Sequence, residues 1–81
     1  MHGMSIGSRI RDARERAEPK ITQHKLAEAC GVRHLAISQW ERDKTVPRAD
    51  QLATIAEACA VDPGWLLTGA GSMETSPEAA A

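Results

Sequence analysis

The chain has 81 residues, with two Trp, no Phe and no Tyr, so it encodes one small domain with an aliphatic, alanine-rich core. The formal net charge is −1, which by itself argues against a nucleic-acid binder, but the charges are unevenly distributed. All ten Lys and Arg lie between Arg9 and Arg48 together with six acids, and the other five acids follow Arg48. A basic face separate from an acidic one explains this asymmetry; a random mixture of charges is the alternative.

Several function classes are disfavoured by what the sequence lacks. No stretch is apolar and long enough to span a membrane, and the N-terminus has no signal-peptide hydrophobic region, so we expect a cytoplasmic protein. The His and Cys residues have no zinc-binding spacing, and no phosphate-binding glycine loop or catalytic triad is present. We therefore expect no metal, no other cofactor and no enzyme activity.

Residues 1–4 are expected to be a disordered N-terminus, and a first helix follows them. Ser5 provides an N-cap hydroxyl, and Pro19 stops the helix soon after residue 17. Arg14 lies beside the apolar face, either as a solvated charge or as a partner in an internal ion pair. The apolar face itself consists of Ile6, Ile10, Ala13 and Ala17.

Two short helices joined by a tight turn are predicted for residues 22–42. Thr22 provides an N-cap for the first, over residues 23–30, whose apolar side includes Leu26 and Cys30. Gly31 then stands where a helix commonly ends with a residue of positive φ. A short turn containing Gly between two helices is typical of a helix-turn-helix.

The second of these helices, over residues 34–42, has two different faces. One is a core face, formed by Ala36, Ile37 and Trp40. The other is an arc of roughly 140° that holds His34, Leu35, Ser38, Gln39 and Arg42. This second set suits the major groove, because carboxamide, hydroxyl and imidazole groups bond base edges and an apolar side chain meets a thymine methyl. An ordinary solvated helix face with one exposed leucine is the alternative.

The rest of the chain contains a basic loop, two further helices and a tail. The loop carries Arg42, Lys44 and Arg48, which are placed to lie along DNA phosphates. A fourth helix is expected over residues 49–60. Asp62 followed by Pro63 is a strong helix start, and the fifth helix ends at Gly69. Residues 70–81 are small, polar and acidic, so we expect a disordered tail or linker.

Residues 6–69 resemble the Xre/Cro-type helix-turn-helix domains of lambdoid phage repressors. The matching residues, spread over about four-fifths of the chain, are Arg14, Gln23, Leu26, Ala27, Gly31, Val32, Ile37, Ser38, Gln39, Trp40, Glu41, Pro47, Leu52, Trp65, Leu66, Leu67, Thr68 and Gly69. The resemblance implies an all-α, five-helix, lambda-repressor-like domain over residues 5–69, with the helix-turn-helix at helices 2 and 3.

The resemblance also implies roles for particular residues. It pairs Arg14 with Glu41, and it makes Gln23 a residue that holds a DNA phosphate at the start of helix 2. It also places the dimer contact around helix 5, where Leu66 or Leu67 would supply apolar surface. Arg33 departs from the family, whose members usually have Ser or Thr there. We expect Arg33 to contact the DNA backbone; a flexible surface arginine is the alternative.

The sequence thus predicts a sequence-specific, repressor-type transcriptional regulator in a bacterial or phage-infected cell. A homodimer would read a two-fold-related double-stranded operator with helix 3 in the major groove. The expected base-reading residues are His34, Leu35, Ser38 and Gln39. The expected backbone contacts are Gln23, Arg33, Arg42, Lys44 and Arg48.

Three alternatives concern partners and length. The chain is either a stand-alone regulator or the DNA-binding piece of a repressor with a further C-terminal domain. An antitoxin of the same fold would have a toxin protein as its main partner. A protein-interaction domain would use the face around Leu35 to bind protein.

Overall fold

Five helices make up the part of the chain that the structure, a computed structural model, describes, which is residues 5–73. They are α1 (Ile6–Arg16), α2 (Gln23–Cys30), α3 (His34–Glu41), α4 (Ala49–Cys59) and α5 (Pro63–Thr68). The described residues form no strand, so the predicted all-α fold with five helices is confirmed.

The ends of these helices follow from their capping residues. The side chains of Ser5, Thr22 and Asp62 accept hydrogen bonds from backbone N–H groups in the first turns of α1, α2 and α5. Gly31 ends α2 in the left-handed conformation, with φ of 66°. Arg33 precedes α3 without a side-chain cap, so that helix begins with its first N–H groups open to other partners.

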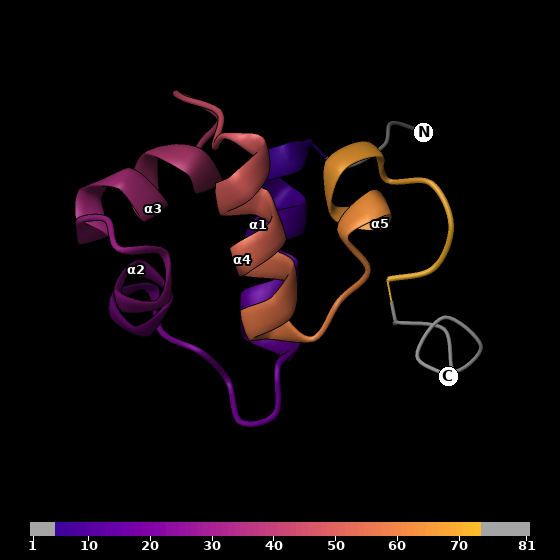
Figure 1. The fold of residues 1–81 in the computed structure, drawn as a ribbon, viewed down its shortest axis with the longest axis horizontal. Coiled ribbons are helices and arrows are strands. Elements are labelled where there is room, and N and C mark those ends of the chain that lie inside the picture. Colours follow the sequence, from indigo (N-terminus) through magenta and orange to yellow (C-terminus); the bar gives the residue numbers. More distant parts are fainter. Residues whose placement is uncertain (1–4, 74–81) are drawn as a thin grey trace.

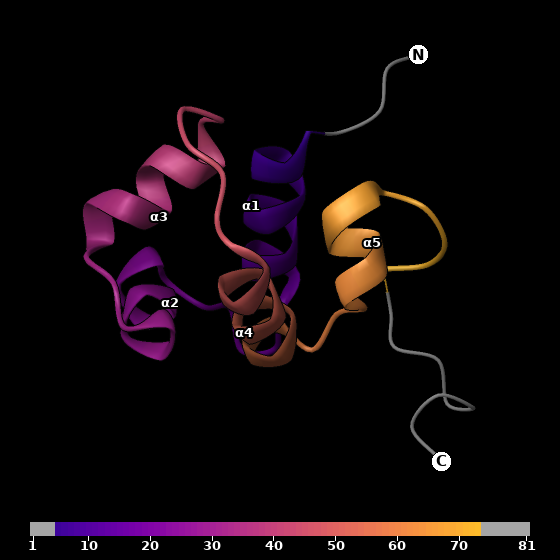
Figure 2. The ribbon, with the colours of Figure 1, turned by 45° about the horizontal axis from the view of Figure 1, so that its top comes forward.

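Helices α2 and α3 lie together on one side of the molecule, α5 lies on the opposite side, and α1 and α4 run between them (Figures 1 and 2). Helix α1 contacts α3, α4 and α5, and α2 packs against both α3 and α4. The helix-turn-helix, formed by α2 and α3, therefore packs with one side against α1 and α4, and its opposite side faces solvent.

The core is aliphatic with two indoles, as the composition predicts. Trp40 and Trp65 are only 5% and 8% exposed. Cys59 is buried and Cys30 half-buried, and both are free thiols. Burial raises the pKa of the Cys59 thiol to about 11, so this side chain stays protonated and packs as a small hydrophobic group. The largest fully buried side chains are Ile10, Leu26, Ile37, Ile55 and Leu66.

A clamp joins the start of α1 to the loop after α3. Asp43 has a φ of 60°, and its carboxylate accepts hydrogen bonds from N of Gly7 at 2.9 Å and from Oγ of Ser5 at 2.6 Å. Gly7 is buried, and a Cβ at this position would press on the carbonyl oxygens of Trp40 and Glu41. The absence of a side chain at Gly7 therefore lets α1 approach the end of α3 closely.

A second contact, the Arg14–Glu41 ion pair, joins α1 to α3 deeper in the molecule. Nε of Arg14 donates to Oε2 of Glu41 at 2.7 Å, and Nη2 donates to Oε1 at 3.1 Å. The side chains are only 10% and 5% exposed. Nη1 of Arg14 also donates to the carbonyl oxygen of Ile21, which fixes the link between α1 and α2. The hydrogen bond to Glu41 raises the pKa of the Arg14 guanidinium, which therefore stays charged.

Arg9 makes a third contact, which the sequence did not reveal. Its Nε and Nη2 donate to the carbonyl oxygens of Leu66 and Leu67, each at 2.9 Å, although Arg9 is itself buried. These two carbonyls lie in the last turn of α5, where backbone acceptors lack partners within the helix. Arg9 thus provides hydrogen-bond donors for the carbonyl oxygens at the end of α5 and holds that helix against α1.

The chain that follows α5 turns back onto the domain. N of Asp62 donates to the carbonyl oxygen of Met73 at 2.8 Å, and the half-buried Met73 packs against the core. Met73 thus lies against the domain, beyond the boundary expected at Gly69, while residues 70–72 form an exposed loop. The expectations for residues 1–4 and for residues 74–81 lie outside the described residues.

We expect Gly7→Ala to lower the free energy of unfolding by about 1–3 kcal/mol, because the added methyl group would overpack a contact formed mainly by backbone atoms. Denaturant unfolding measures the change. Gly64→Ala is the matched control within a helix, since its added Cβ would meet only the side chain of Asp62, at 3.0 Å, and a smaller loss is expected. Equal losses in the two variants would contradict this account of the α1–α3 contact.

Glu41→Ala should lower the free energy of unfolding by about 3–5 kcal/mol, because it leaves the Arg14 guanidinium largely buried without its carboxylate. Replacing Arg14 by Met in the same chain should restore part of that loss, since the uncompensated charge is then gone. A double-mutant cycle on urea unfolding tests this. Strict additivity of the two single losses would show that the pair contributes no coupling.

Candidate nucleic-acid interface

The two faces of α3 are as different as the sequence predicts. Ile37 is fully buried and Trp40 nearly so, which places the core face against α1 and α2. On the other face Leu35 is 59% exposed and His34 is exposed. Ser38 and Gln39, one turn further along, are half-buried. The four expected base-reading side chains therefore come from the first two turns of one helix.

Gln23 connects this face to the buried ion pair. It stands at the first position of α2, and its Nε2 donates to Oε1 of Glu41 at 2.9 Å. Its Oε1 lies 2.7 Å from Nε2 of His34. A continuous series of hydrogen bonds thus runs from Arg14 through Glu41 and Gln23 to the exposed imidazole.

A second histidine lies flat against that imidazole. The rings of His24 and His34 have centroids 4.3 Å apart and planes only 5° from parallel. Each residue stands near the start of its helix, so the helix-turn-helix geometry brings together two side chains ten positions apart. This stack could not be predicted from the sequence, because its formation depends on the angle between α2 and α3.

The expected backbone contacts fall into two groups. Arg33, Arg42 and Lys44 are all exposed, and their side chains form no ion pair with other described residues. Arg48 is different, because its Nε and Nη2 donate to the carboxylate of Asp50 at 3.1 and 3.3 Å. That bond raises the pKa of Arg48 and lowers the pKa of Asp50. A phosphate near Arg48 would have to compete with Asp50.

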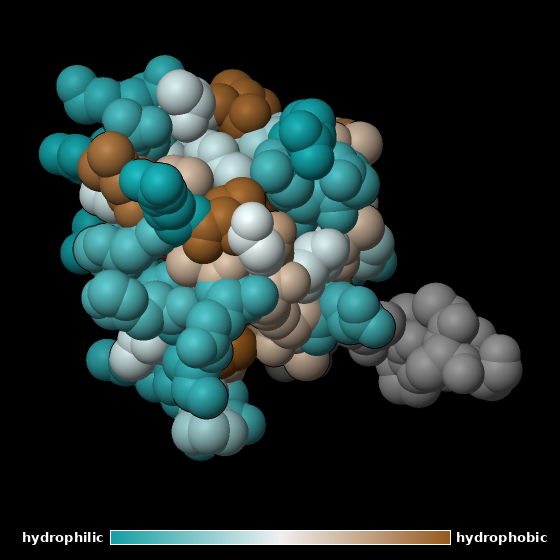
Figure 3. Space-filling model, turned by 60° about the vertical axis from the view of Figure 1, so that its left-hand side comes forward, coloured by the Kyte–Doolittle hydropathy of each residue, from teal (hydrophilic) through white to brown (hydrophobic). Residues whose placement is uncertain are grey.

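The side of the molecule that carries α2 and α3 is mostly hydrophilic. Figure 3 shows it covered by hydrophilic side chains, with hydrophobic ones in small separate areas. A polar hollow opens beside the interface, between α1, α2 and α3. It is lined by Arg11, Arg14, Gln23, Ser38, Glu41 and Arg42. A surface of this kind suits a polar, charged ligand better than an apolar protein partner.

An apolar patch lies elsewhere, where the loop after α3 meets α4 and α5. Val46 and Leu67 are 67% and 49% exposed, whereas Leu66 is fully buried in the core. Of the two leucines considered for a dimer contact, Leu67 is therefore the one that remains on the surface. The apolar patch is lined by Val46, Pro47, Ala49, Leu52, Ala53, Pro63 and Leu67.

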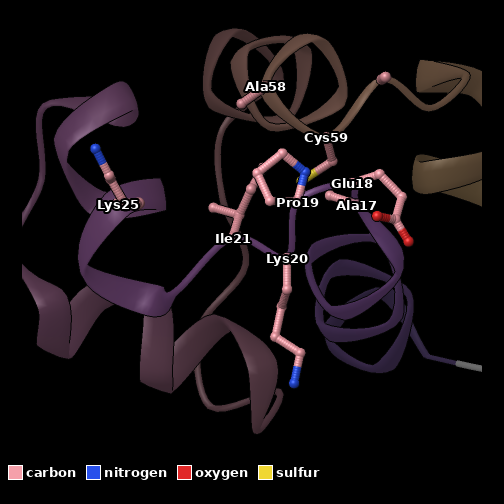
Figure 4. A pocket seen from close by; sticks show the side chains of 9 residues that line it. Ala17, Glu18, Pro19, Lys20, Ile21, Lys25, Ala58 and Cys59 are labelled. Atoms are coloured by element: carbon pink, nitrogen blue, oxygen red, sulfur yellow. The ribbon is translucent and has the colours of Figure 1, made fainter.

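A further hollow lies under the long link between α1 and α2 (Figure 4). It is lined mainly by apolar atoms, from residues 17–21, Lys25 and residues 58–60. Figure 4 shows the side chains of Lys20 and Lys25 extending away from it. Within residues 5–73 no group of three or more His, Cys, Asp or Glu could hold a metal, and no helix could cross a membrane.

Comparison with known proteins supports this arrangement. A helix-turn-helix family model matches residues 10–66. The chain is 39% identical to repressor protein C2 of Salmonella phage P22 over 69 residues, which are 85% of this chain and 31% of that protein. It is 34% identical over 74 residues to the helix-turn-helix transcriptional regulator DicA of Escherichia coli, covering 91% of this chain and 53% of DicA. The chain thus spans between about a third and about half of the length of these relatives.

Solved structures of the P22 c2 repressor have the same fold. One is a crystal structure of that repressor in complex with a synthetic operator, with a TM-score of 0.72 and 39% identity over 82% of this chain and 97% of that chain. Another is the solution structure of its DNA-binding domain, with a TM-score of 0.73 over 93% of this chain and 96% of that one. The matched residues include all of α2 and α3. The chain therefore belongs to the helix-turn-helix family, as an Xre-like DNA-binding domain of the lambdoid repressor type.

Proposed function

We propose that the chain binds DNA sequence-specifically and acts as a transcriptional regulator of the repressor type, in the cytoplasm where it meets its operator. The observation that supports this most is the outer face of α3, with His34 and Leu35 exposed, flanked by exposed basic side chains that form no ion pair within residues 5–73. The fold match to a repressor in complex with a synthetic operator supports it independently.

The proposed readers are the four residues on the exposed face of α3. Gln39 can bond an adenine edge through both atoms of its amide, and Ser38 can bond several base edges. Leu35 can contact a thymine methyl, which explains an apolar side chain exposed on an otherwise polar face. His34 supplies a fourth polar group at the start of the helix.

The proposed backbone contacts surround these readers. Gln23 has a second amide hydrogen besides the one given to Glu41, and it stands at a helix start whose free N–H groups favour an anion. Arg33, Arg42 and Lys44 supply positive charge on either side of α3. Arg48 would also contact the backbone if its guanidinium left the carboxylate of Asp50 and bound a phosphate instead.

The apolar patch is the proposed contact of a homodimer. Helix-turn-helix dimers bind two half-sites about one helical turn apart on the same face of DNA. The apolar patch includes Val46, in the loop directly after α3, so a second copy docked there would contact the chain next to its reading helix. Patches of this kind are commonly interaction sites.

Two other functions would be revealed by their partners. An antitoxin of this fold would co-purify with a toxin protein as well as bind DNA. A protein-interaction domain would bind its partner through the Leu35 face with little dependence on salt, whereas phosphate binding weakens steeply as salt rises. A further domain, present in a longer form of the protein, would add its own partners.

Selection from a randomised duplex library at two salt concentrations tests the function. The expected result is an enriched motif with two-fold symmetry whose retention falls steeply with salt. Failure to retain or enrich any duplex would remove the proposal.

Gln39→Ala should relax the preference at one base pair of each half-site and cost about 1–3 kcal/mol in affinity for the selected operator. The reason is that Ala removes both atoms that bond the base edge while leaving the phosphate contacts in place. Affinities for operator variants changed at single positions measure the effect. An equal loss on every duplex would contradict the assignment of Gln39 as a reader.

Lys44→Ala should weaken binding to all duplexes alike and reduce the salt slope by roughly one, because one phosphate contact is lost. The measurement is affinity for the selected operator and for an unrelated duplex across a salt series. Gln39→Ala serves as the matched control, with an unchanged salt slope. A change in sequence preference in the Lys44 variant would contradict its role at the backbone.

Leu67→Glu should prevent dimerisation while leaving the recognition of bases by α3 unchanged. Affinity for the full operator should fall at least about tenfold, which corresponds to about 1.4 kcal/mol, because each chain then binds alone. Affinity for a single half-site should stay the same. Ala58→Glu adds the same charge on the exposed part of α4 outside the apolar patch and is the control. An undiminished affinity for the full operator in the Leu67 variant would exclude the apolar patch as the dimer contact.

A further inference from the structure

The Arg14–Glu41 pair fixes the direction of every hydrogen bond between it and the DNA-facing surface. An ionised carboxylate can only accept hydrogen bonds. Because Oε1 of Glu41 lies 2.9 Å from the amide of Gln23, that amide must present its Nε2 to the carboxylate. Its oxygen is then forced to face the other way, toward His34.

The orientation of Gln23 in turn decides which nitrogen of His34 carries the proton. An amide oxygen accepts and cannot donate, so the 2.7 Å contact requires a hydrogen on Nε2 of His34. A neutral imidazole has only one N–H, which leaves Nδ1 as an acceptor. No described residue donates a hydrogen bond to Nδ1 in the structure.

The stacked ring of His24 holds the plane of this imidazole. With a centroid separation of 4.3 Å and an angle of 5°, rotation of the His34 ring would lose the contact between the two faces. The bond from Gln23 fixes one edge of the ring and the stack fixes its plane. Together they leave His34 with a defined tautomer and a defined orientation, although the side chain is exposed.

We propose that His34 selects a base that offers an amino group, through an acceptor nitrogen set by Arg14, Glu41 and Gln23, with His24 as a positioning residue. In the major groove adenine and cytosine present amino donors, whereas guanine and thymine present acceptors at the corresponding atoms. On the strand that His34 contacts, adenine or cytosine is therefore favoured over guanine or thymine. This inference rests on the proposed function, because it concerns the DNA that α3 reads.

The tautomer is tested on the free protein by ¹⁵N NMR of the histidine rings in mildly alkaline buffer, where imidazole is neutral. The expected spectrum shows His34 protonated at Nε2 and unprotonated at Nδ1. In Gln23→Leu, which removes the accepting oxygen, both tautomers should be present. A wild-type His34 protonated at Nδ1 would overturn the inference whether or not the protein binds DNA.

The base preference is tested by duplex selection with four proteins: wild type, His34→Ala, His24→Ala and His24→Phe. His34→Ala identifies the position read by His34 as the one where preference disappears. There the wild type should favour adenine or cytosine by about fivefold, the value of one hydrogen bond. His24→Ala should reduce that ratio toward one, whereas His24→Phe, which retains an aromatic face for stacking, should keep it.

An unchanged preference at every position in His34→Ala would show that His34 reads no base and would overturn the inference. A selected operator with guanine or thymine favoured at the His34 position overturns the inference while leaving the proposed function intact. An equal base preference at the His34 position in wild type and His24→Ala would show that His24 does not position the imidazole of His34. If no duplex is retained although the Nε2 tautomer is observed, the proposed function fails, and the base preference fails with it.

Discussion

The buried carboxylate of Glu41 is the group on which the rest of this small domain depends. It stands at the meeting point of α1, α2 and α3 and accepts from both Arg14 and Gln23. A charge this deeply buried is tolerated only when it is paired and fully hydrogen-bonded. The requirement therefore fixes α1 against α3 and, through the same carboxylate, orients side chains at the surface.

Along α3 the core residues and the proposed DNA-reading residues lie on opposite sides of the helix, although Glu41 is linked to both. The buried side chains of α3 are held by packing, while the proposed readers lie on the opposite side, where His34 and Leu35 are exposed and Ser38 and Gln39 are half-buried. Substitutions among the readers can thus change the sequence that is recognised at small cost in stability. Glu41 and Gln23 are exceptions, because they belong both to the folded framework and to the hydrogen bonds that lead to the proposed DNA-binding surface. A change at either residue affects stability and recognition together.

Local signals in the sequence predicted the helices well, because caps such as Ser5, Thr22 and Asp62 act within one turn. Contacts between distant residues were harder to predict. Arg14 and Glu41 are 27 positions apart, and only the family resemblance joined them. The contacts of Arg9 with α5, of Asp43 with α1 and of His24 with His34 depend on how whole helices pack. Periodicity and composition carry no information about such packing.

We propose that the start of α2, together with α3 and the loop after it, forms the DNA-binding surface. Backbone amide NMR of the protein titrated with its selected operator tests the location of this surface most directly. The predicted result is a set of large shift changes confined to residues 23–25 and 33–44, with a second set at the apolar patch if a dimer forms. Changes concentrated where α1 meets α5, around Arg9, with α3 unaffected, would contradict it.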